Sequence, residues 1–210
     1  MTEAMLYDYW RSSASWRVRI ALNAAGIPFR SVTVDLLAGD QRGDAHLERN
    51  PQGFIPVLEI DGLRLTQSLA IVDHIDETRN AGFLPGDAAG RARVRALAHV
   101  VAMDTHPVCN PSVVSEVVRL TDGGDAVREG WMHWFIRRGL AAFERMLADG
   151  PQGRFCHGDR PGLADFCLIP QVYNADRWGV DRADLTRIDA IARSCAELPA
   201  FAKAHPDSVR

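Results

Sequence analysis

Long apolar runs, an excess of positive charge and clustered cysteines are all missing from this sequence. The beginning of the chain carries Glu3 and Asp8 and has no apolar stretch of the length that a signal peptide or a membrane helix needs. We therefore expect a cytoplasmic protein. The formal net charge is −3, from 24 basic and 27 acidic residues, which gives no sign of nucleic-acid binding.

Cysteine is scarce, and its spacing argues against a metal site built on thiolates. No two of the four cysteines form a close pair of the kind that binds zinc: Cys109, Cys156, Cys167 and Cys195. We expect each to be a small buried apolar residue and not a disulfide partner or a ligand. The seven histidines form no ligand cluster either, and we expect no metal.

Hydroxyl side chains are concentrated where a short strand around Leu6–Tyr9 gives way to a helix that ends at Gly26. Ser12, Ser13 and Ser15 lie at the start of this helix. Free backbone N–H groups and the positive end of the helix dipole favour an anion there, and serine hydroxyls can donate to it. Two interpretations stay open on this local pattern: ordinary N-capping of the helix, or a site that holds a thiolate.

The remaining pattern of the first eighty residues alternates between strands and helices. Phe29–Val34, Val57–Ile60 and Leu63–Leu65 are predicted strands, and the dipeptide between the last two, Asp61-Gly62, is a strong hairpin signal. Ser68 is the expected N-cap of a helix whose buried face includes Ile71, Val72 and Ile75. The order strand, helix, strand, irregular loop, strand, strand, helix is that of a thioredoxin-like α/β domain.

The motifs on these elements resemble those of the zeta-class glutathione transferases, the family that includes maleylacetoacetate and maleylpyruvate isomerases. The resemblance runs almost end to end. It is carried by the serine-rich signature Ser12–Leu22, by Asn50-Pro51, by Pro56-Val57, and by Gln67-Ser68-Leu69-Ala70-Ile71. It implies a glutathione transferase fold, in which an all-helical domain follows the thioredoxin-like one.

The resemblance implies that glutathione is the cofactor and assigns parts of it to particular residues. Ser12 stabilises the thiolate, the peptide bond before Pro56 is cis, and Ser68 receives the γ-glutamyl carboxylate. Ala14 stands where the family motif often has cysteine, so any role of that thiol is absent here. The residues of this half that we expect at glutathione are Ser12, Ser13, Ala14, Ser15, Trp16, Arg17, Gln41 (glycyl end), Pro56, Val57 (cysteinyl part), Gln67 and Ser68.

After a linker at Asn80–Asp87 the apolar spacing becomes helical, so we expect domains at residues 1–83 and 89–210. Thr121–Gly124 is a predicted turn between two long helices. Leu163–Trp178 is a predicted helix, broken or kinked near Pro170. Its expected start lacks the capping hydroxyl of the family, because Gly162 stands there and leaves Asp165 to cap alone.

Polar groups gather again where the helical pattern breaks, at Asp104–Ser112. A kinked helix explains the break without any function. By resemblance, His106, Asn110, Pro111 and Ser112 face glutathione. For Asp104 two interpretations stay open: a charge on the helix surface, or a contact with glutathione across a dimer interface.

The resemblance implies a homodimeric isomerase that adds the glutathione thiolate to a cis alkene, lets the bond rotate and expels the thiolate. By this resemblance, Arg11 and Arg177 match arginines that hold substrate carboxylates, and they form the expected catalytic set with Ser12 and Ser13. Taken alone, either arginine also fits a solvated surface charge. We expect maleylacetoacetate as substrate. Maleylpyruvate isomerisation, dehalogenation of small α-halo acids, and a non-catalytic binding module are the alternatives.

Overall fold

A computed structural model describes residues 3–210, and the chain forms two compact units. The first contains the residues up to Phe83 together with Ala196–Arg210, and the second contains Leu84–Cys195. The last fifteen residues therefore pack with the first unit, although the whole second unit lies between them and Phe83 in the sequence. The division into two contiguous domains at 1–83 and 89–210 remains a prediction.

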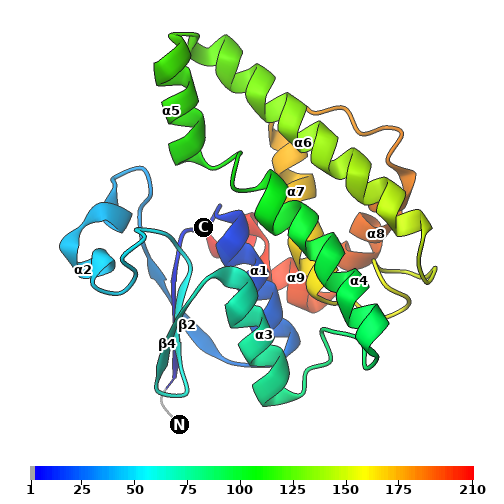
Figure 1. Cartoon of the computed structure of the whole chain (residues 1–210). Helices are drawn as coiled ribbons and strands as arrows, with labels where there is room; N and C mark the ends of the chain where they lie inside the picture. The colour runs from blue at the N-terminus through cyan, green and yellow to red at the C-terminus, as the bar shows by residue number, and fades with distance from the viewer. Residues whose placement is uncertain (1–2) are drawn as a thin grey trace. The chain divides into compact units, whose positions relative to one another are not determined.

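The first unit is built on a four-stranded mixed sheet with the strand order β2-β1-β3-β4 (Figure 1). β1 runs parallel to β2 and antiparallel to β3, and β3 runs antiparallel to β4. The thioredoxin-like order of elements is confirmed. The strands and helices of this part are β1 (Ala4–Asp8), α1 (Ser13–Ala24), β2 (Phe29–Thr33), η1 (Asp40–Arg42), α2 (Asp44–Leu47), β3 (Val57–Ile60), β4 (Leu63–Thr66) and α3 (Ser68–Arg79).

The hairpin between β3 and β4 turns at the dipeptide that the sequence indicated. Asp61 and Gly62 have φ values of 55° and 77°, so both central residues of the turn are left-handed, as a tight two-residue hairpin requires. α1 and α3 pack together and bury Val18, Ile71 and Ile75. The helical spacing of these apolar residues places them on the buried faces of the two helices.

The end of the chain packs on α1 as α9 (Pro199–Ala204) and α10 (Pro206–Val209). Arg19 donates from Nε to the carbonyl oxygen of Ala204 at 3.1 Å, and the Trp16 ring meets the His205 ring edge-on at 5.2 Å between centroids. These polar and aromatic contacts explain why the last fifteen residues belong to the first unit.

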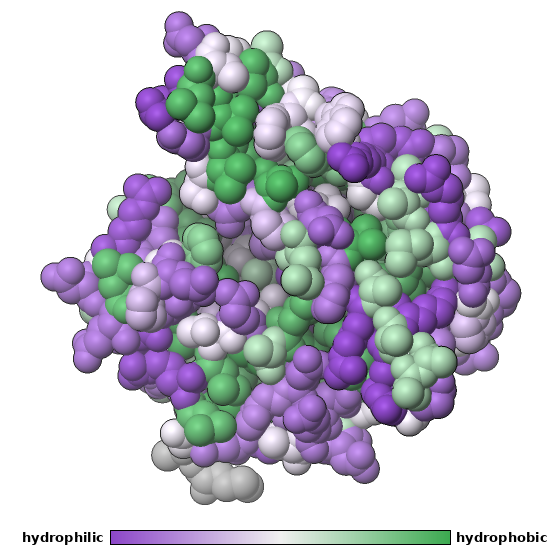
Figure 2. Space-filling model, in the orientation of Figure 1, coloured by the Kyte–Doolittle hydropathy of each residue, from purple (hydrophilic) through white to green (hydrophobic). Residues whose placement is uncertain are grey.

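The second unit is helical, as the apolar spacing predicted (Figure 1). Its elements are α4 (Ala88–His99), a π-helical segment η2 (Val100–Thr105), α5 (Pro111–Thr121), α6 (Gly124–Ala148), α7 (Leu163–Arg177) and α8 (Thr186–Ala196). Figure 2 shows apolar surface gathered over α5, where Val113 and Leu120 are exposed. In the part of the chain that the structure describes, no helix has the length and apolarity to cross a membrane.

The expected break near Pro170 does not occur. α7 continues through the proline from Leu163 to Arg177. The start of this helix does follow the prediction for Asp165, whose carboxylate accepts from the Gly162 N–H and from the Cys156 N–H, each at 2.9 Å. Asp165 therefore satisfies a backbone donor of the preceding loop as well as the N-cap donor, and it does so without a hydroxyl at Gly162.

Candidate functional site

Ser12 is the N-cap of α1, and its hydroxyl uses a lone pair for that purpose. Ser12 Oγ accepts from the Ser15 N–H at 3.2 Å, while the Ser12 N–H donates to the Tyr9 carbonyl at 2.8 Å. A serine hydroxyl has one proton and two lone pairs, so capping leaves the proton free to donate. N-capping and stabilisation of a thiolate are therefore compatible at Ser12.

The residues that follow Ser12 form the first turn of α1. Ser13 and Ala14 are half-buried at its start, and Trp16 is buried against His205. Ser15 is fully buried, and within residues 3–210 its hydroxyl oxygen has no hydrogen-bond partner. The Ser15 hydroxyl is closed off from the surface, so its predicted contact with glutathione stays a prediction.

The prediction that Ser68 is the N-cap of α3 is wrong by one position. Gln67 occupies the N-cap with φ 66°, so Ser68 becomes the first helical residue and its hydroxyl does not cap the helix. Instead, Ser68 Oγ accepts from Arg17 Nη1 at 3.3 Å. Because Arg17 lies one turn into α1 and Ser68 opens α3, this hydrogen bond holds the N-terminal ends of two helices side by side.

Both helix ends carry unpaired backbone N–H groups, since the first four donors of any helix lack intrahelical acceptors. Anions bind at such ends because donors and the helix dipole act together. Gln67 has a positive φ, a conformation that costs free energy in a non-glycine residue. The starts of α1 and α3, at Ser12 and Ser68, are therefore candidate sites for an anion.

The loop before β3 brings further polar side chains to the start of α3. The Ile55–Pro56 peptide bond is cis, which confirms the expectation from the resemblance, and Val57 begins β3 directly after it. Gln67 Nε2 donates to Gln52 Oε1 at 2.8 Å. The sequence did not reveal this contact of Gln52, because nothing in its local pattern indicates that it lies beside Gln67 at the start of α3.

Gln41 lies in η1 and faces the same loop. A Cβ atom on Gly53 would come within 3.1 Å of the Gln41 carbonyl oxygen, so the two backbones are in close approach. The side-chain Oε1 of Gln41 is buried and, in the described part of the chain, has no hydrogen-bond partner. The predicted contact of Gln41 with the glycyl end of glutathione stays a prediction.

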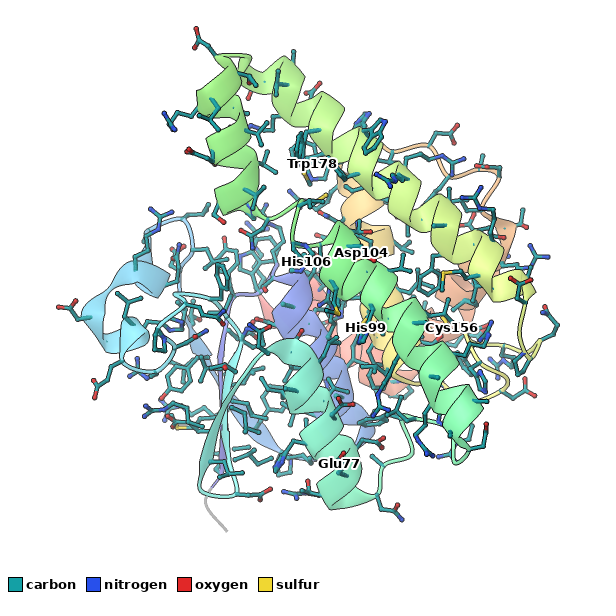
Figure 3. The ribbon with its side chains drawn as sticks, viewed as in Figure 1. Glu77, His99, Asp104, His106, Cys156 and Trp178 are labelled. Carbon is teal, nitrogen blue, oxygen red and sulfur yellow. The ribbon has the colours of Figure 1, made fainter. Side chains whose placement is uncertain are left out.

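In the second unit, the polar segment lies where α4 ends in a π-helical turn, a feature that occurs often at functional sites. Figure 3 shows His99, Asp104 and His106 along this stretch. His106 is half-buried and its N–H donates to the Val101 carbonyl at 2.8 Å, while Asp104 is exposed on η2.

Asn110, Pro111 and Ser112 form the start of α5. Asn110 is its N-cap and accepts from the Ser112 N–H at 3.0 Å and from the Ser112 hydroxyl at 2.8 Å, with Pro111 at the first helical position. These three residues thus have a structural role as a helix start. Their contact with glutathione stays a prediction.

The two arginines expected at the substrate carboxylates are held by different neighbours. Arg11 lies over the Trp10 ring at 5.3 Å from its centroid. Arg177 is exposed in the last turn of α7 and donates to Asn174 Oδ1 at 3.3 Å. A guanidinium can bind a carboxylate with two parallel hydrogen bonds, and the roles of Arg11 and Arg177 at a substrate stay predictions.

The protein's own cysteines are unsuited to act as nucleophiles. All four are buried, as the sequence indicated, and none forms a disulfide bond. Burial raises the pKa of the Cys109 thiol to about 12 and raises those of Cys156 and Cys195 well above the ordinary value, so these thiols stay protonated at neutral pH. Residues 3–210 contain no group of three or more side chains that could hold a metal ion.

Comparison with known proteins identifies the two halves of the chain. Residues 3–77 match the N-terminal domain of glutathione S-transferases, and residues 125–202 match the C-terminal domain of the same enzymes. The chain belongs to the glutathione S-transferase family. The resemblance read from the serine signature and the thioredoxin-like fold are both confirmed.

Individual members of this glutathione S-transferase family are similar over almost the whole chain. The maleylacetoacetate isomerase of Rhizobium meliloti (strain 1021) is 59% identical over 209 residues, which cover 99% of this chain and 98% of that relative. A solved maleylpyruvate isomerase, a bacterial glutathione S-transferase of the zeta class, has a TM-score of 0.94 at 39% identity, with 97% of both chains covered.

A second solved relative contains the expected ligand. The maleylacetoacetate isomerase from Anaeromyxobacter dehalogenans 2CP-1, with glutathione bound in its active site, has a TM-score of 0.88 at 44% identity. The match covers 98% of this chain and 96% of that one. These relatives are named for the same kind of isomerisation, on maleylacetoacetate or on maleylpyruvate.

Proposed function

We propose that this protein binds glutathione and catalyses the glutathione-dependent cis-trans isomerisation of a maleyl diketo acid, with maleylacetoacetate converted to fumarylacetoacetate. The observation that carries the proposal is the pair of adjacent helix ends at Ser12 and Ser68 in a chain 59% identical to a maleylacetoacetate isomerase. The four cysteines of the protein are buried and cannot reach a substrate as nucleophiles, so the thiol that this reaction needs is proposed to be that of glutathione.

The donor set fits glutathione, a tripeptide thiol with a carboxylate at each end. The residues proposed to hold it in the first unit offer hydroxyls, side-chain amides and the backbone N–H groups of two helix starts. Bound glutathione supplies a thiolate that adds reversibly to the alkene carbon, so that the former double bond can rotate before the thiolate leaves.

Ser12 donates its hydroxyl proton to the thiolate and, with the start of α1, lowers the thiol pKa from roughly 8.5; each unit corresponds to about 1.4 kcal/mol of preference for the thiolate. Ser13 adds an N–H of the first turn. Arg11 and Arg177 hold the substrate carboxylates and stabilise negative charge that develops on the substrate. His106 and the start of α5 are proposed to contact glutathione from the second unit.

Replacement of Ser12 by alanine tests the proposal. We expect turnover to fall by roughly a hundredfold, as for loss of one donor to a developing anion, with little change in glutathione affinity. Asp87→Ala is the matched control, because Asp87 caps α4 by accepting from the Gly90 N–H at 2.8 Å. It removes a helix cap and its stabilisation of about 1 kcal/mol without touching the thiolate site, so its turnover should be unchanged.

The substrate is tested by assays of maleylacetoacetate and maleylpyruvate side by side, with and without glutathione. Turnover of the first without consumption of glutathione supports the proposal. Maleylpyruvate remains the second candidate, because a solved structure with TM-score 0.94 is a maleylpyruvate isomerase. Glutathione binding with no turnover of either would favour dehalogenation of α-halo acids or a non-catalytic binding module.

The proposal includes a cytoplasmic homodimer that acts in the breakdown of aromatic amino acids. The family and the chemistry of maleylacetoacetate support this assignment. Sedimentation at micromolar concentration should give the mass of two chains, and a monomer mass would contradict the homodimer.

A further inference from the structure

Arg17 is a cation inside the first unit. Its side chain is 2% exposed, and its Nη1 donates to Ser68 Oγ, which is itself in a residue only 7% exposed. A buried guanidinium is costly unless its donors are bound, and one of the donors of Arg17 is bound to this hydroxyl. This hydrogen bond also has a consequence for Ser68.

The Arg17 guanidinium can only donate, because it has N–H groups and no acceptor. In the pair with Ser68, the serine oxygen must therefore accept, and its own proton is left to point to a different acceptor. The nearby positive charge also makes the hydroxyl a stronger donor toward an anion. Arg17 thus occupies one of the two lone pairs of the Ser68 hydroxyl and favours rotamers in which its proton is directed to another acceptor.

The surroundings of Ser68 favour a carboxylate as the acceptor. Ser68 is the first residue of α3, so backbone N–H groups of the first turn are free beside its hydroxyl. Gln67, held at φ 66° with its side chain bound to Gln52, keeps the preceding residue out of the helix and leaves this end open. A carboxylate can accept from the hydroxyl and from the N–H groups at once.

We propose that Arg17 is a positioning residue for cofactor selectivity: it holds the Ser68 hydroxyl as a donor, and this makes the start of α3 selective for a carboxylate. The proposal rests on the proposed binding of glutathione, whose γ-glutamyl α-carboxylate is the group recognised. Arg17 itself does not need to touch the ligand.

The experiment compares two peptides by calorimetry: glutathione, and an analogue in which 4-aminobutyrate replaces the γ-glutamyl residue and so removes only the α-carboxylate. Each is titrated into the wild-type protein and into Arg17→Met, Arg17→Lys, Ser68→Ala and the double variant R17M/S68A. Arg19→Lys is the matched control, because Arg19 is an equally buried arginine of α1 whose hydrogen bonds go to Asp8, Trp10 and Ala204.

We expect the wild-type protein to bind glutathione about tenfold or more tightly than the analogue, as for a hydrogen bond to a charged group. Arg17→Met and Ser68→Ala should each lose roughly tenfold in affinity for glutathione and almost none for the analogue. The double variant should lose no more than either single one, because both act on one hydroxyl. Arg19→Lys should keep the wild-type preference even if its melting temperature falls.

Several results would overturn the proposal. Equal losses of affinity for both peptides in the Arg17 variants would show that Arg17 contributes to stability alone. If Arg17→Met does not fold, Arg17→Lys is enough for this comparison. Equal wild-type affinity for the two peptides would refute carboxylate recognition while the proposed function stands. A wild-type protein that binds neither peptide would overturn the proposed function as well.

Discussion

Replacement of Arg19 by methionine should be among the most destabilising single changes in the first unit. Arg19 is 1% exposed and donates from Nη1 to both carboxylate oxygens of Asp8, at 2.8 and 2.7 Å; Asp8 is 3% exposed. It also donates from Nη2 to the Trp10 carbonyl at 2.8 Å and from Nε to the Ala204 carbonyl at 3.1 Å. One side chain therefore ties β1, the start of α1 and the end of the chain together.

The magnitude follows from what the methionine leaves behind. Asp8 would be a buried carboxylate whose remaining hydrogen bond comes from the Ser31 hydroxyl at 3.3 Å, and two carbonyls would lose a donor. Removal of one partner from a buried pair costs about 3–5 kcal/mol. For a chain of this size each kcal/mol corresponds to about 2–4 °C, so the melting temperature should fall by roughly 6–20 °C.

Differential scanning calorimetry of three variants checks this reasoning. Arg79→Met is the control, because its ion pair with Asp61 is one-third exposed on both sides and such pairs contribute about 0–1 kcal/mol. The double variant D8L/R19M should be more stable than Arg19→Met alone, since no unpaired charge stays buried. A loss below about 1 kcal/mol in Arg19→Met, or a double variant less stable still, would refute the argument.

Three further predictions concern packing, charge and the thiols. Gly150→Ala should lower the free energy of unfolding by about 1–3 kcal/mol, because the new Cβ would lie 2.0 Å from the Arg93 guanidinium. Gly130→Ala is the control, because its new Cβ would have nothing within 4 Å, and it should be neutral or stabilising by up to about 1 kcal/mol. Chemical unfolding compares the two variants. The hydrogen bond from Arg79 lowers the pKa of Asp61, so the contribution of this pair to stability is present above pH 3.8 and is lost as the pH falls through the lowered value. The free energy of unfolding of Asp61→Asn should therefore differ from that of the wild type at pH 7 and converge with it in acid. A difference that stays constant with pH would count against the pair. All four cysteines should resist a thiol reagent in the native protein, and rapid labelling of any one would contradict their burial.

The fold was predictable because its signals are local. Alternation of apolar residues, the Asp61-Gly62 turn and the helix end at Gly26 each depend on a few neighbouring residues, and each appears in the structure. The errors are also local in origin. The residue type of Ser68 predicts an N-cap, but Gln67 takes that position with a positive φ. The helix therefore begins at Ser68, one residue earlier than predicted, and the local sequence does not specify that backbone conformation.

The missed contacts have a different cause. Arg17 and Ser68 are 51 positions apart, Gln52 and Gln67 are 15 apart, and Arg19 and Ala204 are 185 apart. None of these pairs has a periodicity that would reveal it, because each depends on how two elements pack. The same limit explains why the sequence indicated the linker near Phe83 but not the return of the last fifteen residues to the first unit.

The two interpretations of the serine-rich start, capping and thiolate stabilisation, stop being alternatives once the hydrogen bonds are assigned by donor and acceptor. Ser12 accepts from the Ser15 N–H and keeps its proton, and Ser68 accepts from Arg17 and keeps its proton. In both cases an internal donor occupies one lone pair and leaves the hydroxyl proton for another acceptor. A helix cap at one position and a buried arginine at the other therefore produce the same result, a serine prepared to donate to an anion, and a ligand with a thiolate and a carboxylate can use both.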